Sequence, residues 1–219
     1  MIIAVDGPTA SGKGTISKEL AKHYGLPFLD TGLLYRGVGW TVLNQGGDAD
    51  NPEDALAACM FDALLLDNPA LRSEAIGGLA SRVSVHPKVR GALHKRQRDF
   101  AYQSGGAVLD GRDIGTVIAP DADVKLFVTA STEARAVRRF EEMKRRAEQG
   151  SGDPVNFDDI LADIVKRDER DQSRSTAPLK PAEDADLLDT TDLTIGDAIQ
   201  QAIALVDAKI SRRGKKGPA

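Results

Sequence analysis

A glycine-rich segment near the start of the chain contains the residue types that bind phosphate. It reads Gly7-Pro8-Thr9-Ala10-Ser11-Gly12-Lys13-Gly14-Thr15, and it lies between an apolar run at residues 2–5 and an amphipathic stretch at residues 16–24. This order predicts a strand, a loop and a helix. Loop amides and the unpaired N–H groups of a first helical turn bind anions, and the helix dipole adds positive potential at the same place. Lys13 adds a point charge for the outer phosphates, so the segment predicts a nucleoside triphosphate site.

The end of this segment departs from the usual spacing, in which Ser or Thr follows the lysine directly. Here Gly14 intervenes and the hydroxyl arrives at Thr15. This ending resembles the Gly-Lys-Gly-Thr of nucleoside monophosphate kinases. We expect Mg²⁺ at the site, with Thr15 and Asp110 as its candidate ligands, directly or through water. The alternative is a chance glycine-rich turn, which the strand before it and the helix after it disfavour.

Further short apolar runs occur at residues 27–29, 107–109, 124–128 and 187–188, separated by longer segments with helical spacing. Such alternation predicts an α/β fold of the P-loop NTPase kind, with a parallel sheet of about five strands flanked by helices. In such sheets ligands bind beyond the carboxyl ends of the strands. The residues that follow each run are therefore candidates for the site.

Two of these strand ends carry charged candidates. Thr31 follows the second run, and the guanidinium of Arg36 matches a phosphate through two parallel hydrogen bonds. The third run ends in Asp110-Gly111-Arg112-Asp113. We expect Asp110 to orient Mg²⁺ or its waters, Arg112 to neutralise a phosphate, and Asp113 to accept from an amino group or a hydroxyl. The alternatives are a solvated surface arginine and an ordinary tight turn.

A predicted helix that begins at Asn156 changes character along one face. Its stripe begins with apolar residues at 157, 160 and 164 and continues with Arg167, Asp171 and Arg174. Charged side chains on a buried face need a ligand or a counter-charge. A polyanion would satisfy them. The alternative is a helix that leaves the core with an exposed network of ion pairs.

The chain of 219 residues fits a single domain with two excursions. We expect a core of residues 1–32, 105–130 and 175–212, an inserted cap at about 33–104 and a lid at about 138–174. Breaks in the cap are expected at residues 46–47, 68–69, 77–78 and 86–87. Glycines and a proline at residues 150–154 favour a mobile connection within the lid.

Composition excludes several classes of protein. The chain is 41% hydrophobic and carries a formal net charge of −4 with one cysteine, Cys59. These values disfavour disorder, a membrane span, a broad nucleic-acid surface and a disulfide or cysteine-rich metal site. We expect a cytoplasmic monomer with no membrane or nucleic-acid partner. The basic tail at residues 211–219 is read as a solvated terminus, with a nucleic-acid tail as the alternative.

Together these residues resemble the bacterial cytidylate (CMP) kinases. The resemblance spreads over most of the chain, and its third and fourth blocks are the specific ones. The four blocks are residues 6–15, 29–36, 110–117 with 124–128, and 166–178. One departure is in the cap, where the family often carries a strand-rich hairpin and this chain has only a turn at residues 67–70.

The resemblance implies transfer of a phosphoryl group from ATP, with Mg²⁺, to CMP or dCMP. Residues 7–15 would hold ATP. Ser81, Arg90 and Asp113 would read the cytosine, and Asp171 with Arg174 would bind the sugar hydroxyls. Thr31, Arg36 and Arg112 would hold the acceptor phosphate, while Lys13, Arg139 and Arg167 would close on the transferring group. The alternatives are another small P-loop kinase, for UMP, AMP or a small metabolite, and a P-loop NTPase switch or binding module.

Overall fold

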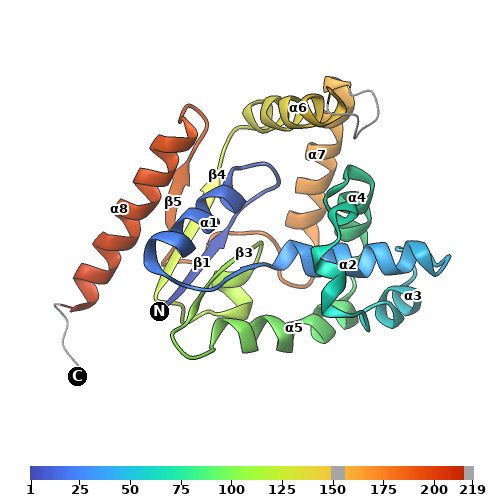
Figure 1. Ribbon diagram of the computed structural model, residues 1–219, viewed down its shortest axis with the longest axis horizontal. Helices are drawn as coiled ribbons and strands as arrows, with labels where there is room; N and C mark the ends of the chain where they lie inside the picture. Colours follow the sequence, from blue (N-terminus) through green and yellow to red (C-terminus); the bar gives the residue numbers. More distant parts are fainter. Residues whose placement is uncertain (149–155, 215–219) are drawn as a thin grey trace.

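The computed structural model of the protein describes residues 1–148 and 156–214. The expected strands form, and they make one parallel sheet in the order β2-β3-β1-β4-β5. The central strand, β1, leads at its carboxyl end into the phosphate loop (Figure 1). The prediction of a five-stranded parallel sheet is confirmed. The strands are β1 (Ile2–Asp6), β2 (Phe28–Asp30), β3 (Ala107–Gly111), β4 (Val124–Thr129) and β5 (Asp186–Asp189).

Helices cover both faces of the sheet. Ile3 and Val5 of β1 pack in the cluster formed with α1 (Lys13–Tyr24) and α8 (Ile195–Gly214). Ala4, between them, faces the other side, where α5 (Pro87–Ala101) and the π-helical turn η3 (Ile114–Ile118) pack. This alternation is the two-residue period of a strand buried on both faces.

Residues 33–104 pack around an apolar cluster of their own. This part of the chain consists of α2 (Thr31–Asn44), α3 (Pro52–Ala57), the 3₁₀ turns η1 (Ala63–Asp67) and η2 (Pro69–Arg72), α4 (Glu74–Val83) and α5. Figure 1 places α2, α3 and α4 together on the side of the molecule away from α8. Residues 33–104 contain no strand.

Three of the four breaks predicted in this region are confirmed, and the one at residues 77–78 is wrong. Helix α4 runs unbroken through Gly77 and Gly78. A Cβ on Gly77 would lie 2.8 Å from Nη2 of Arg36 and 3.0 Å from Nη1 of Arg167. Gly77 therefore makes room for two guanidinium groups against the side of the helix. In the sequence, a glycine needed for space looks the same as a glycine that ends a helix.

Helices α6 (Thr132–Glu148) and α7 (Phe157–Ser173) share a small cluster built on Ala136, Ile160 and Ile164. Asn156 caps α7 as expected, because its side chain accepts from the N–H of Asp158. The connection predicted to be mobile, at residues 150–154, lies outside the described residues.

Part of the basic segment expected to be a frayed tail, residues 211–219, is helical. Helix α8 continues to Gly214, so residues 211–214 are helical where a frayed terminus was expected, and residues 215–219 lie outside the described part of the chain. Within the described ranges no helix has the length and apolar character needed to cross a membrane.

Candidate active site

The phosphate loop, residues 7–12, leaves an open concavity at the positive end of α1. A Cβ on Gly7 would lie 2.0 Å from the carbonyl oxygen of Val128, so the loop lies directly on β4 and no side chain fits there. Gly12 has φ of 88°, and a Cβ on it would meet nothing within 4 Å. The hydroxyl of Ser11 is buried without a hydrogen-bond partner among the described residues. The open space and the unpaired amides of the first turn of α1 together fit an anionic ligand.

Lys13 and Asp110 lie at the bottom of this concavity. Nζ of Lys13 donates to the carbonyl of Pro8 at 3.2 Å and is 3.9 Å from Oδ1 of Asp110. Burial, with nearby Arg112, lowers the pKa of Lys13 to about 8, and burial raises the pKa of Asp110 to about 6. Burial removes water from both charged groups, and their ion pair at 3.9 Å compensates for only part of that loss. Phosphate oxygens at this position would stabilise the charged lysine.

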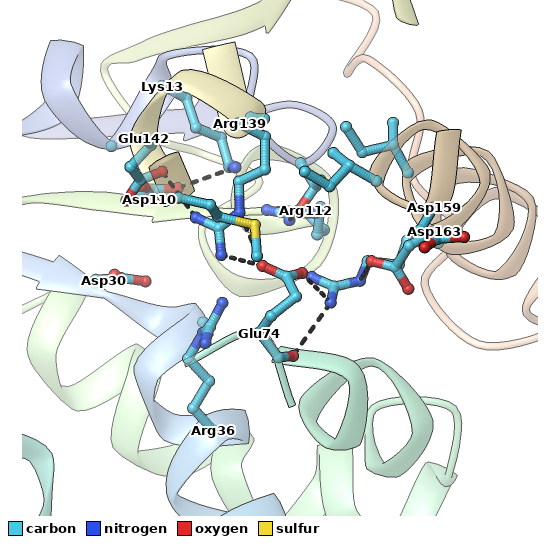
Figure 2. Close-up of a pocket in the computed structure, with 18 of the residues that line it drawn as sticks. Lys13, Asp30, Arg36, Glu74, Asp110, Arg112, Arg139, Glu142, Asp159 and Asp163 are labelled. Atoms are coloured by element: carbon cyan, nitrogen blue, oxygen red, sulfur yellow. Dashed lines mark hydrogen bonds and ion pairs between the residues drawn. The ribbon is translucent and has the colours of Figure 1, made fainter. Parts of the chain in front are cut away.

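A cavity of about 460 Å³ extends from Lys13 between the phosphate loop, α4 and α7. Its lining includes the five cations Lys13, Arg36, Arg112, Arg139 and Arg167. These side chains come from separate elements of the chain, and Figure 2 shows Lys13, Arg36, Arg112 and Arg139 gathered around the cavity. The structure therefore brings together all the basic residues that the sequence assigned to phosphate groups.

Glu74 lies among three of these arginines. It accepts from Nε of Arg139 at 2.8 Å and also accepts from Nη2 of Arg139 and Nη2 of Arg167. Burial alone would raise its pKa, but Arg167 and Arg139 bring the pKa below the usual range, so Glu74 is ionised at neutral pH. Burial, Arg167 and Arg139 lower the pKa of the neighbouring Arg36 to about 10. Positive charge is therefore concentrated around one carboxylate.

A second, smaller pocket of about 90 Å³ lies between α2, α4 and the turn after β3. Arg90 donates to Asp113 inside it, both side chains are buried, and the guanidinium lies 5.5 Å from the centre of the Tyr35 ring. Ser81 and Thr31 also line this pocket. The hydroxyl of Thr31 donates to the carbonyl of Asp110 at 2.7 Å, which fixes the start of α2 against β3.

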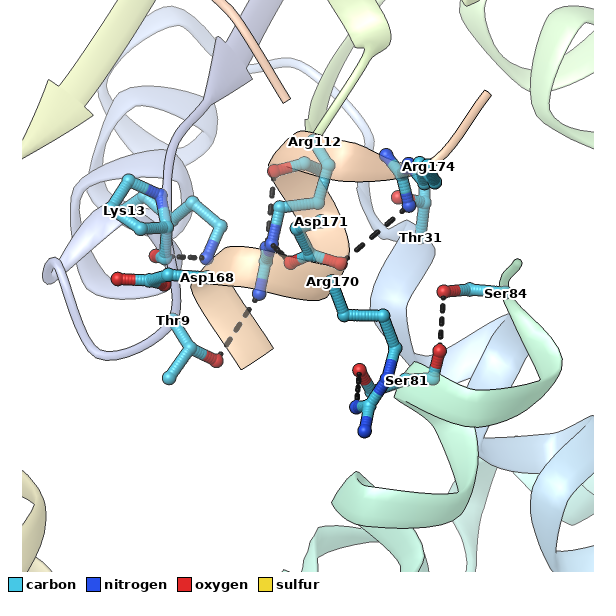
Figure 3. Close-up of polar contacts among 12 residues, drawn as sticks. Thr9, Lys13, Thr31, Ser81, Ser84, Arg112, Asp168, Arg170, Asp171 and Arg174 are labelled. Carbon is cyan, nitrogen blue, oxygen red and sulfur yellow. Dashed lines mark hydrogen bonds and ion pairs between the residues drawn. The ribbon is translucent and has the colours of Figure 1, made fainter. Parts of the chain in front are cut away.

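Arg112 lines both cavities. Its Nε lies 3.1 Å from Oδ2 of Asp171, and its Nη2 donates to the hydroxyl of Thr9 at 3.2 Å (Figure 3). Burial would lower the pKa of Arg112, but Asp171 and Asp110 raise it. Arg174 lies 3.7 Å from Asp171, and its Nη2 is buried without a partner among the described residues. The charged end of α7 therefore faces the strand ends.

The structure does not bring Thr15 and Asp110 into one cavity. Thr15 lines a third cavity, about 460 Å³ in volume, on the other side of the phosphate loop, together with Arg138, Thr190 and Ile195. Gly14 is the residue beside Asp110, because a Cβ on it would be 3.1 Å from Oδ2. Within the described ranges no group of three or more His, Cys, Asp or Glu residues is placed to hold a metal. A metal near Asp110 would therefore take most of its ligands from phosphate and water.

Sequence reasoning missed several residues of the site. Glu74 is one, and Arg170, whose Nη1 donates to the hydroxyl of Ser81 at 2.6 Å, is another (Figure 3). Asp168, which accepts from Arg135 at 2.5 Å, is a third. Arg170 and Asp168 were visible only as part of the charged end of α7. No local spacing pointed to Glu74, because its partners lie 65 and 93 residues away.

Known proteins are similar to this chain in sequence and in fold. The family model described as cytidylate kinase matches residues 3–208. The chain is 54% identical over 209 residues to the cytidylate kinase of Rhodopseudomonas palustris, covering 95% of this chain and 96% of that protein. It is 52% identical over 214 residues to the cytidylate kinase of a Caulobacter species, covering 97% of each.

A solved structure of an uncharacterised protein from Eubacterium ventriosum has the same fold. The two are 16% identical with a TM-score of 0.54, over 94% of this chain and 98% of that one. This likeness concerns the fold alone. The family match and the relatives cover nearly the whole chain, and the phosphate loop and cationic cavity are the parts that a phosphoryl-transfer enzyme needs. The chain therefore belongs to the cytidylate kinase family.

Proposed function

We propose that this protein transfers the γ-phosphoryl group of ATP to CMP or dCMP and releases ADP with CDP or dCDP. The observation that carries the proposal is the convergence of Lys13 and four arginines on one cavity beside the phosphate loop. Two polyanions that repel each other can be held together only where positive charge is concentrated. A switch protein has no use for so many cations on the acceptor side.

The donor side is the phosphate loop. The loop amides and Lys13 would hold the phosphates of ATP. Thr15 would lie on the other side of the loop, in the third cavity. The third cavity, which adjoins the loop and has apolar residues such as Ile195 and Ala198 in its wall, would receive the nucleoside. Asp110 would hold Mg²⁺ directly or through water, and the ion would neutralise phosphate charge.

The acceptor side is the smaller pocket with residues 33–104 as its cap. The exocyclic amino group of cytosine is a hydrogen-bond donor, and the carboxylate of Asp113 is an acceptor suited to it. Arg90 and Ser81 would contact the remaining polar edge of the base, and Asp171 and Arg174 the sugar. Thr31, Arg36 and Arg112 would hold the phosphate at the boundary between the two cavities.

No side-chain base is needed for the transfer. The second pKa of a phosphate monoester is about 6, so its oxygen is largely ionised at neutral pH. The protein has to align the two nucleotides, to stabilise charge on the transferring group through Lys13, Arg139 and Arg167, and to exclude water. Residues 138–174, as a lid, would exclude water by closing over the cavity. One chain supplies every residue named here, so we propose that the protein acts as a monomer.

A panel of acceptors tests this function. ADP formation is followed in a coupled assay with ATP, Mg²⁺ and, separately, CMP, dCMP, UMP or AMP. We expect rapid ADP formation with CMP or dCMP and much slower formation with UMP, which lacks the amino donor. A preference for AMP or for UMP would indicate a different acceptor. Release of inorganic phosphate at the same rate with and without any acceptor would indicate a nucleotide switch.

A further inference from the structure

The carboxylate of Glu74 connects two parts of the molecule that are far apart in the sequence. Glu74 is the first residue of α4, within the cap, and its side chain binds Arg139 of α6 and Arg167 of α7. Figure 2 shows the carboxylate of Glu74 beside the guanidinium group of Arg139, and the other carboxylate oxygen binds Arg167. An anionic group of this protein therefore lies where the proposed function requires the anionic substrates to meet.

Both arginines already donate to carboxylates. Nε and Nη2 of Arg139 face Glu74, and its Nη1 donates to Glu142 at 2.7 Å. Arg167 binds Glu74 through Nη2, and its Nε lies 2.7 Å from Asp163 without a hydrogen-bonding angle. A guanidinium group that is already paired with two carboxylates has to release one of them before it can bind phosphoryl oxygens through two parallel N–H groups.

The acceptor phosphate is the group suited to displace Glu74. Arg36, which the proposed function assigns to that phosphate, donates to the carbonyls of Leu71 and Ser73, directly before Glu74. A phosphate dianion bound at Arg36 would therefore come close to the carboxylate and repel it. Water at the same place is neutral and exerts no such force.

We propose that Glu74 is a specificity residue that distinguishes the acceptor nucleotide from water. With only ATP bound, Glu74 keeps Arg139 and Arg167 paired, so the transferring phosphoryl group lacks their positive charge and hydrolysis is slow. When the acceptor phosphate arrives, it displaces Glu74 and frees the N–H groups of Arg139 and Arg167 that Glu74 held, while Glu142 and Asp163 stay beside the two arginines. This inference rests on the proposed function.

Replacing Glu74 by Gln tests the inference, because Glu74→Gln keeps the shape and removes the charge. ATP hydrolysis without CMP and ADP formation with CMP are measured on one preparation. We expect hydrolysis to rise about tenfold, the effect of one charge-assisted contact on a stabilising group, while CMP-dependent turnover changes less than about threefold. Glu74→Ala, as a second variant, should show the same rise, and Glu74→Asp should restore slow hydrolysis.

Glu142→Gln is the matched control, because it also removes a carboxylate that pairs with Arg139. Glu142 lies on the same helix as Arg139, and the substitution leaves Glu74 in place. Its hydrolysis without CMP should stay within about twofold of the unmodified protein. Unchanged hydrolysis in Glu74→Gln, a parallel fall of hydrolysis and turnover, or an equal rise in Glu142→Gln would each overturn the inference. If the unmodified protein itself forms no ADP in response to CMP, the proposed function fails instead.

Discussion

Carboxylates position the arginines of the central cavity, because Glu74 binds Arg167 and Asp171 binds Arg112. Replacing Arg167 or Arg112 by Ala should lower kcat with CMP by about 10²- to 10³-fold, the loss typical of removing one preorganised donor to a transition state. Thermal unfolding should change little, because each site still contains other arginines. Lys95→Ala is a suitable control, because Lys95 forms an exposed pair with Asp99. Near-normal turnover in either arginine variant would refute the assigned role.

Asp6 is a second residue whose chemistry can be measured. It is buried and accepts from the N–H groups of Ile114 and Gly115, each at 2.8 Å, and burial raises its pKa from 3.8 to about 7. Between these values the folded protein binds more protons than the unfolded chain. The contribution of Asp6 to the free energy of unfolding therefore falls as pH rises through this window.

The variant Asp6→Asn does not titrate. The free energy of unfolding of the unmodified protein, minus that of Asp6→Asn, should fall between pH 5 and pH 7 by at most about 1.4 kcal/mol per pH unit. Urea unfolding of both proteins at several pH values measures this difference. A difference that stays constant or grows with pH would contradict the raised pKa of Asp6 in the folded state.

At the residue scale, a site formed by one continuous segment is easier to predict from the sequence than a site assembled from distant segments. The phosphate loop is one unbroken segment, so its function can be read directly. Asp113 was expected as a hydrogen-bond acceptor at a strand end, the role of Arg90 and Asp113 toward cytosine came from the family resemblance, and the structure places the two in one ion pair. Glu74 was not predicted, because a single acidic residue at a helix start has an ordinary explanation in the helix dipole.

At the scale of elements, α4 is a helix in which Gly77 makes room for side chains of the cavity. Gly77→Ala should favour the helix by roughly 0.5 to 1 kcal/mol through propensity, because alanine is the better helix former. The added methyl group would displace the guanidinium ends of Arg36 and Arg167, which are flexible. We therefore expect normal or slightly higher thermal stability and a fall of about tenfold in CMP-dependent turnover.

The neighbouring Gly78 gives a matched comparison, because a Cβ there would meet nothing within 4 Å. Gly78→Ala should gain the same helix propensity and keep its activity. An equal loss of activity in both variants would show that the helix backbone, and not the space beside Gly77, controls the reaction.

The elements that the sequence predicted correctly are those with a strong local pattern. Buried strands read as apolar runs, and α7 has both a cap and a stripe. The sequence did not distinguish a glycine that ends a helix from a glycine that accommodates a neighbouring side chain. That distinction depends on Arg36 and Arg167, which approach Gly77 only in the folded chain.

At the scale of the whole molecule, the packing is unequal. The sheet is covered on both faces by large apolar clusters, whereas α6 and α7 share a small cluster with three buried members, Ala136, Ile160 and Ile164. Amides of α6 and α7 should therefore exchange with solvent faster than amides of β1 and β4. Adding CMP with a non-hydrolysable ATP analogue should slow exchange in α6, α7 and α4 and leave β1 unchanged. Uniform exchange, or no response to nucleotide, would contradict a lid.

The central position of β1 has a consequence for biosynthesis. Ile3 pairs with Val108 on one side and with Val124 on the other, so β1 leaves the ribosome before either of the strands that pair with it. Pairings over such sequence separations are entropically costly and slow to form. The phosphate loop is thus translated before both strands that flank β1, and it takes its final form only after they pair. Until β4 emerges, the nascent chain depends on delayed collapse or chaperone protection of that apolar strand.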